Sequence, residues 1–294
     1  MNKIKKTKGD IIFTIINTAA MLLFSAVMLY PMWYVVVASF SDAKEFMANG
    51  GPMLLPVSPS LQAYKAAFSN PLLLSGYGTT LFVVGMGTFL GVLFTFVAAY
   101  FFSRSDVKLQ KPLFLLLFVT MYFSGGTIPF YFTVKDVGLD NSVWSLVIPT
   151  IMTTYNMIIV RTAMYGIPSS LEEAAKIDGA GHITILFRVI LPLSKATLSV
   201  IALYYAVDKW NAWFNAMLFV KDREKWPLQL VLREILINNS NGNAMGGALS
   251  SEDAFVAETI KYATIVISTA PILCIYPFIQ KYFVGGVMIG AVKG

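Results

Sequence analysis

Long apolar runs alternate with short polar connections along the chain. Five stretches contain no charged side chain, namely residues 11–40, 66–103, 112–134, 141–160 and 262–280. A membrane-spanning helix needs about 20 predominantly apolar residues, so each stretch is long enough for one crossing. The hydrophobic pattern therefore predicts an all-α integral membrane protein.

A further apolar stretch, residues 196–220, is interrupted by Asp208 and Lys209. We count it as a helix because its length is sufficient and because adjacent opposite charges can face the interior of a helix bundle. The chain is then a single transmembrane domain over residues 1–294. Its six predicted membrane helices occupy residues 11–40, 77–102, 112–134, 141–165, 196–220 and 260–283.

The first apolar run follows a lysine-rich start, as in a secretory signal peptide. Signal peptides have an apolar region of roughly 7–15 residues, about half the length of this run. The length therefore favours an uncleaved first membrane helix.

Composition agrees with a membrane location. Of the 294 residues 56% are hydrophobic and only 13% are charged, about half the charged share of an ordinary soluble domain. The single cysteine, Cys274, excludes an intrachain disulfide framework, and the single histidine, His182, leaves little for metal binding or histidine-based catalysis. We expect no catalytic residue and no metal site in this chain.

Basic residues are distributed unequally among the connections. The amino terminus carries four lysines, and three basic residues lie between positions 104 and 111, whereas the first and third connections together carry three. The positive-inside rule then places both termini and the connection 168–192 in the cytoplasm, and the long connection 221–259 outside. The net charge of +6 follows from this bias and does not indicate a nucleic-acid surface.

The second predicted helix contains a G-x-x-x-G pair, Gly87 and Gly91, near Gly85. Small residues at this spacing permit close contact between helices. Packing inside the bundle and a specific dimer face both remain open.

The connection 168–192 has the pattern of a short helix. Pro168 ends the preceding helix. Ser169 or Ser170 can cap a new one, because Glu172 and Glu173 each follow a serine by three residues. The glutamates then lie at the positive end of the helix dipole.

Asp178-Gly179 and Gly181 break this helix, and a second helical run over residues 183–191 puts Ile183, Leu186, Phe187 and Ile190 on one face until Pro192 stops it. The segment is a helix, a turn and a second helix on the cytoplasmic side. It could insert as a knob into a groove of another protein, or rest on lipid headgroups as an amphipathic loop.

The same segment resembles a known motif. Residues with the spacing of the EAA motif of ABC importer permeases occur at Glu173-Ala174-Ala175, Gly179, Val189 and Leu191-Pro192. The family usually has isoleucine at the position of Val189. The resemblance implies a permease of six membrane helices whose cytoplasmic coupling helix, between helices 4 and 5, enters a cleft on an ATP-hydrolysing subunit.

By this resemblance Glu173 meets a basic residue of the ATPase, while the small residues allow close approach. The implied ATPase-coupling residues are Glu172, Glu173, Ala174, Ala175, Asp178, Gly179, Ala180 and Gly181. The implied partners are a homologous second permease subunit in a heterodimer, two ATPase subunits that bind ATP and Mg, and an extracytoplasmic solute-binding protein. The implied location is the bacterial plasma (inner) membrane.

Further residues resemble the carbohydrate-uptake branch, whose type member is a maltose permease. They are Tyr30-Pro31, Ser39-Phe40-Ser41 and the terminal residues 290–294. In that branch the carboxy-terminal tail reaches the ATPase dimer, which implies a contact through Val292, Lys293 and Gly294. A frayed terminus is the alternative.

The chain lacks the G-x-x-x-x-G-K-[ST] loop, so ATP must be bound by partners. Polar groups in membrane helices are costly and mark candidate pathways. Aromatic rings and amides suit sugars, and the candidate pathway residues are Asn156, Tyr204, Tyr205, Asp208, Trp210, Asn211, Trp213 and Asn215. Alternatively, Asp208 and Lys209 form a structural pair, the tryptophans mark the membrane interface, and the partner permease holds the substrate.

The external segment around residues 238–251 is rich in Asn, Gly and Ser and predicts a flexible loop. Two other functions compete with sugar import. An ATPase-independent secondary transporter would leave the EAA segment unexplained. An ABC permease for a peptide, amino acid or anion would fit the motif, but an anion carrier should show more unpaired basic residues along the pathway.

Overall fold

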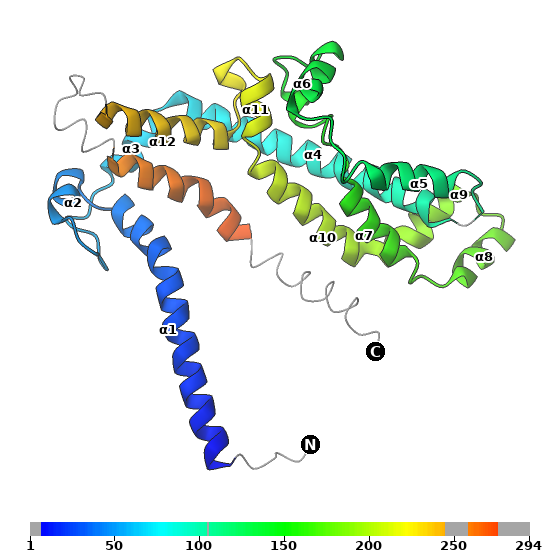
Figure 1. Ribbon diagram of the computed structural model, residues 1–294, viewed down its shortest axis with the longest axis horizontal. Helices are drawn as coiled ribbons and strands as arrows, with labels where there is room; N and C mark the ends of the chain where they lie inside the picture. Colours follow the sequence, from blue (N-terminus) through cyan, green and yellow to red (C-terminus); the bar gives the residue numbers. More distant parts are fainter. Residues whose placement is uncertain (1–6, 105, 245–257, 276–294) are drawn as a thin grey trace. The chain divides into compact units, whose positions relative to one another are not determined.

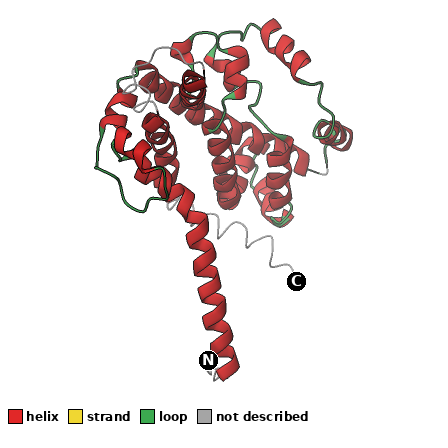
Figure 2. Cartoon of the chain, turned by 60° about the vertical axis from the view of Figure 1, so that its left-hand side comes forward, coloured by secondary structure: helices red, strands yellow, loops and turns green. Residues whose placement is uncertain are grey.

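The computed structural model describes residues 7–104, 106–244 and 258–275. Helices and their connecting loops make up this part of the chain, and no strand occurs in it (Figure 2). The all-α class predicted from the hydrophobic pattern is therefore confirmed. The chain divides into two compact units, residues 1–70 with 234–270, and residues 71–233 with 271–294.

The first unit contains α1 (Lys8–Ser39), α2 (Ala43–Asn49), α3 (Gln62–Phe68) and most of a helix over Glu258–Ile275. Its small core is formed by buried residues from the last turn of α1 and from the segment that follows it. They are Val37, Ala38, Phe46 and Met53, with Tyr34, Val57 and Tyr262 packed against them. The ring of Tyr262 lies 5.4 Å from that of Phe46 and 6.1 Å from that of Tyr34.

The helix α1 begins with a capping box. The Thr7 hydroxyl accepts from the Asp10 amide at 3.2 Å, and the Asp10 carboxylate accepts from the Thr7 amide at 2.9 Å. Most of α1 is apolar and exposed; for example, Phe13 is 70% exposed and Leu23 69%. Exposed apolar surface on a helix of 32 residues is what a lipid-facing span requires.

The second unit is built on three helices that lie side by side, α4 (Pro71–Ser103), α7 (Thr154–Met164) and α10 (Leu191–Trp210) (Figure 1). Their core consists of large apolar side chains from all three. Among its fully buried members are Phe96, Met157, Ile201 and Tyr205. The sites described below all belong to this second unit.

Three of the predicted membrane helices are broken in the structure. The segment 112–134 forms α5 (Gln110–Val119) and α6 (Thr127–Asp136), and Gly126, at φ +88°, is the non-helical residue directly before α6. The segment 141–165 forms the 3₁₀ turn η1 (Val143–Leu146) and α7, with Pro149 in the break. The segment 196–220 forms α10 and α11 (Phe214–Phe219).

Four helices of the described residues are long and apolar enough to cross a membrane: Lys8–Ser39, Pro71–Ser103, His182–Trp210 and Glu258–Ile275. The first, second, fifth and sixth predicted spans each overlap one of them. Residues 276–283 of the sixth lie outside the described residues.

The segment 221–259 was expected to be a loop; its residues 245–257 lie outside the described residues, and the part before them differs from the expectation. It contains the 3₁₀ turn η3 (Arg223–Lys225) and a helix of 17 residues, α12 (Leu228–Ala244). The start of α12 is apolar, with Leu228, Leu230, Val231 and Leu232 buried, and the Leu228 amide donates to Thr80 Oγ1 of α4 at 2.8 Å. Burial of this apolar turn favours the helix over the loop predicted from the Asn-rich composition that follows.

Pro192 was expected to stop the helical run before it, and this prediction is wrong. The helix continues from α9 (His182–Thr184) through η2 (Ile185–Ile190) into α10. The segment η2 is a π-helix. A proline removes one backbone donor and clashes with the carbonyl four residues earlier, and a wider π turn accommodates both effects. Of the four residues predicted to share one face, Leu186 and Ile190 are buried, whereas Ile183 is 76% and Phe187 43% exposed.

Candidate functional site

The EAA segment forms a helix and a tight turn, as predicted, but with a different cap. The helix α8 (Ser169–Ile177) begins at Pro168, which supplies no side-chain cap. The predicted serine cap is therefore wrong: both serines lie in the first turn. Pro168, with a φ of −58° and a ψ of 131°, occupies the cap position itself.

A Schellman motif ends α8. The Ala180 amide donates to the Ala175 carbonyl at 2.9 Å, and the Gly179 amide donates to the Lys176 carbonyl at 3.0 Å. Gly179 takes the left-handed conformation at φ +77°, which glycine adopts at no steric cost. The turn sends the chain directly into α9.

The two adjacent glutamates of α8 face opposite ways. Glu172 is buried, whereas Glu173 is exposed. Ala175 and Ala180 pack against the core of the second unit. Four other residues of the predicted coupling set, Ala174, Asp178, Gly179 and Gly181, are also exposed.

The outward side of this segment also carries apolar side chains. Leu171 is 43% exposed, Ile177 87% and Ile183 76%. Exposed apolar side chains of this kind are typical of a surface that binds another protein or a membrane.

The inward glutamate pairs with a residue that the sequence did not single out. Arg104, after the end of α4, donates from Nη1 to the Glu172 carboxylate. A cleft of about 600 Å³ opens beside this pair and is lined by residues from the end of α4, the end of α7 and the start of α8. Because the partners are 68 residues apart in sequence, no local sequence pattern predicts the contact.

The glycine pair of α4 packs against α10. A Cβ at Gly87 would lie 3.1 Å from Cε of Lys209, and one at Gly91 would lie 3.0 Å from the Ile151 carbonyl oxygen and 3.1 Å from the Tyr205 ring. The pair thus serves packing within the chain, one of the two alternatives left open.

Several pathway candidates are core residues. The Tyr205 hydroxyl is buried against Thr95 Oγ1, at 2.6 Å, and accepts from the Thr153 amide at 3.1 Å. Trp210 and Asn156 are also buried, and Tyr204 packs against the core. These four side chains hold helices together in this conformation.

Lys209 is buried although it lies in an apolar bundle. Its Nζ donates to the Leu146 carbonyl at 3.2 Å, to the Thr150 carbonyl at 3.1 Å and to the Thr150 hydroxyl. The ammonium therefore binds the polar groups exposed by the break between η1 and α7. Asp208, its neighbour, is exposed.

The other candidates meet around one cavity. Asp208, Asn211, Trp213 and Asn215 line a space of about 280 Å³, together with Thr150 and Lys209 among others. Amide, carboxylate and indole groups converge here, as expected for a polar solute. Four of the eight predicted pathway residues therefore line this cavity. The predicted tail contacts Val292, Lys293 and Gly294 lie outside the described residues.

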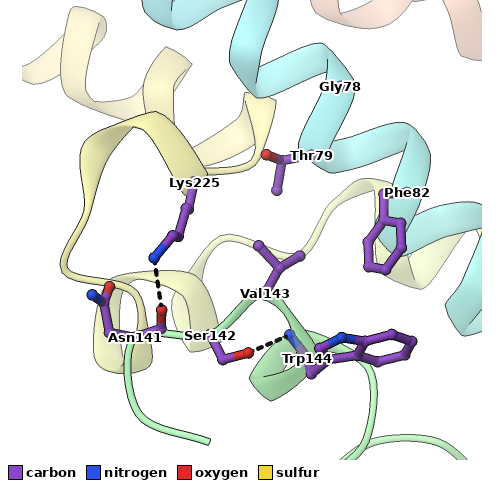
Figure 3. A pocket seen from close by; sticks show the side chains of 8 residues that line it. All are labelled: Gly78, Thr79, Phe82, Asn141, Ser142, Val143, Trp144 and Lys225. Carbon is purple, nitrogen blue, oxygen red and sulfur yellow. Dashed lines mark hydrogen bonds between the residues drawn. The ribbon is translucent and has the colours of Figure 1, made fainter.

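A second cavity lies at the other end of α4 from Arg104. Gly78, Thr79 and Phe82 form one side of this space of about 510 Å³, and residues 141–144 with Lys225 form the other (Figure 3). The rings of Phe82 and Trp144 meet edge to face at 5.3 Å. Lys225 Nζ donates to the Asn141 carbonyl at 3.3 Å.

Ion pairs and hydrogen bonds connect charged residues beside this cavity. Asp140 accepts from Lys221 Nζ at 2.7 Å, and Asp222 accepts from Lys225 Nζ at 2.7 Å and from Asn141 Nδ2 at 2.9 Å. The lysine hydrogen bonds lower the pKa of both carboxyl groups, and the bond to Asp140 raises the pKa of Lys221. The rim is thus held by mutually compensated charges.

No protein-family profile matches the chain, but individual proteins do. The chain is 39% identical to Protein LplC of Bacillus subtilis over 292 residues, which cover 98% of this chain and 97% of that protein. It is 38% identical to the polygalacturonan/rhamnogalacturonan transport system permease protein YtcP of the same organism over 283 residues, covering 96% and 99%.

A solved structure shows the same architecture. A bacterial ABC transporter involved in the import of the acidic polysaccharide alginate contains a chain that is 30% identical to this one, with a TM-score of 0.84 over 96% of this chain and 100% of that chain. The EAA segment, the apolar spans and these similarities agree. The chain belongs to the family of permease subunits of sugar and oligosaccharide ABC transporters, and it is a membrane-embedded transport component.

Proposed function

We propose that this chain is one permease subunit of an ABC importer that carries a sugar or oligosaccharide across the bacterial plasma membrane. A binding protein outside delivers the solute, a homologous permease completes a heterodimer, and two partner ATPases bind ATP and Mg. The outward side of α8 supports the proposal most directly, because it combines exposed Leu171 and Ile177 with the carboxylate of Glu173.

In this proposal α8 is the coupling helix. Its exposed apolar side chains enter a cleft of the ATPase, Glu173 pairs with a basic residue there, and the Schellman turn at Gly179 keeps the tip narrow. The small residues Ala174 and Gly181 let the two backbones approach closely.

The proposed topology has six membrane helices with both termini in the cytoplasm, and the length of α4 supports one of these crossings. Gly78 at the Lys225 cavity and Ser103 beside Arg104 are 25 residues apart on one helix, or about 38 Å at 1.5 Å per residue. This exceeds the hydrocarbon core of about 30 Å. With α8 in the cytoplasm, the Lys225 cavity faces the outside.

The relatives suggest the cargo. Two of the transport systems to which the chain is similar are named for polygalacturonan/rhamnogalacturonan and for alginate, which are polysaccharides. We therefore propose an oligosaccharide as the cargo. The cavity lined by Asn211, Trp213 and Asn215 offers the amide and aromatic groups that bind sugar rings.

The test is ATP hydrolysis by the reconstituted complex with its binding protein. We expect stimulation by an oligosaccharide and loss of ATPase association in Glu173→Lys. The matched control, Glu224→Lys, makes the same charge change at an exposed residue of η3 and should keep the ATPase bound. Stimulation by no saccharide would overturn the cargo, and an intact complex in Glu173→Lys would overturn the coupling role of α8.

A further inference from the structure

The small helix α8 lies between α7 and α9 along the chain, and it also contacts the end of α4. It follows α7 directly, through residues 165–168, and it is bonded to the end of α4 through Glu172 and Arg104. Only nine residues long, α8 buries little apolar surface of its own. The buried ion pair is therefore a major non-covalent link between α8 and a membrane helix.

Both partners of the link are withdrawn from water. The Glu172 side chain is 8% exposed and that of Arg104 16%. A buried pair of this kind costs desolvation energy, and removing one partner leaves an uncompensated charge. The contact is therefore sensitive to the geometry of both helices.

Arg104 is held rigidly on α4. Its Nε and Nη2 donate to Ser103 Oγ at 3.2 and 3.1 Å, and its guanidinium lies 4.6 Å from the centre of the Tyr100 ring. The remaining Nη1 reaches Glu172. Because three parts of the guanidinium are engaged, a shift of Glu172 must pull on the end of α4.

The end of α4 is in turn bonded to its neighbours. The Phe102 carbonyl accepts from Arg161 Nε of α7 at 2.7 Å and from the Gln110 side chain of α5. The Arg161 guanidinium lies 4.0 Å from the centre of the Phe114 ring of α5. A force applied at Arg104 therefore reaches a point where α4, α5 and α7 meet.

We propose that Arg104 and Glu172 are positioning residues that make α4 move with α8. The proposal rests on the coupling role assigned to α8 above. Glu173 faces the ATPase, and its neighbour Glu172 passes the movement inward to α4, whose far end carries Gly78 and Phe82 of the outer cavity. The covalent connections of α8 run to α7 and α9, and the ion pair adds a direct link to the end of α4.

The proposal is tested with the complete complex in liposomes, supplied with its binding protein and with a saccharide that stimulates hydrolysis. Saccharide uptake and ATP hydrolysis are measured in the same vesicles. Arg104→Glu and Glu172→Arg should each keep the ATPase bound but reduce the saccharide transported per ATP on the order of tenfold, a common size for coupling between sites. The double variant Arg104→Glu/Glu172→Arg should restore most of the ratio.

The matched control is Lys108→Glu, which makes the same charge change at an exposed residue of the same connection and should leave the ratio unchanged. An unchanged ratio in both single variants would overturn the proposal, as would a double variant no better than either single one. If a single reversal prevents assembly, Glu172→Gln removes the charge but keeps the shape, and it must still lower the ratio. Failure of the coupling role itself would show separately, as retained ATPase in Glu173→Lys.

Discussion

At the scale of single residues, the glycines of α4 illustrate how the absence of a side chain can allow two helices to pack closely. Gly91 lies where a Cβ would approach the Ile151 carbonyl oxygen, a backbone atom that cannot turn away. Gly85 faces open space on the same helix. The two positions therefore form a matched pair.

We expect Gly91→Ala to destabilise the folded chain by about 1–3 kcal/mol, the usual cost of overpacking a core. Gly85→Ala should be neutral or slightly stabilising, because alanine is the better helix former. Thermal unfolding of the detergent-purified complex measures both. Equal shifts in the two variants would contradict the packing role of Gly91.

The charged residues at the rim of the Lys225 cavity predict that the stability of this region depends on pH. The pKa values of Asp140 and Asp222 are lowered in the folded state. Their contribution to the stability of the folded state is therefore complete above the usual carboxyl pKa of 3.8 and is lost as the pH falls through the folded pKa values. The pKa of Lys221 is raised, so its contribution is complete below 10.5 and is lost above the folded value.

Hydrogen exchange can follow this contact, since the amides of Lys221 and Asp222 both donate to Asn141 Oδ1 at 3.0 Å. We expect their protection to hold at neutral pH and to fall below about pH 3.8. Asp222→Asn, which removes one titrating group, should weaken the acid response. Protection that is insensitive to acid in the parent chain would exclude this role of the carboxylates.

At the scale of elements, the turn between α8 and α9 depends on backbone conformation. Gly179 has a φ of +77°, while Gly181 has a φ of −76° and open space around it. An L-residue in the left-handed region costs roughly 1–2 kcal/mol, and Gly181 carries no such penalty.

Gly179→Ala should therefore lower the melting temperature of the complex and weaken ATPase association, whereas Gly181→Ala should behave like the parent. Pull-down of the ATPase and thermal unfolding are the two measurements. A Gly181→Ala variant as damaged as Gly179→Ala would point instead to a side-chain clash with the partner.

Sequence pattern predicted the elements unevenly, and the reasons are physical. The uncharged run around α1 stays helical through Pro31, and α4 is continuous from Pro71 to Ser103. The runs 112–134 and 141–165 contain Gly126 and Pro149, and both break. At Pro192, by contrast, the helix does not break, because the π-helix directly before it accommodates the proline.

At the scale of the whole molecule, the proposed topology predicts which surfaces face the cytoplasm. Lys108 follows α4, and Glu224 lies beside Lys225, which lines the cavity at the other end of α4. The native Cys274 is exposed and unpaired, so it is first replaced by serine.

In that background, a membrane-impermeant maleimide should label Glu224→Cys in intact cells and Lys108→Cys only after permeabilisation. Labelling of both positions from the same side would contradict the proposed orientation. The experiment also tests whether the Lys225 cavity faces the outside.

The sequence by itself determined the membrane class, the helical content and the position of the EAA segment, because apolar runs, glycines and prolines act within a few residues along the chain. Tertiary structure decided what each polar residue does. Only packing shows that Glu172 faces Arg104 while Glu173 faces outward, that Lys209 binds the broken turn at Thr150, and that Tyr205 belongs to the core. These partners lie 52 to 68 residues apart, and such contacts exist only once the helices have come together.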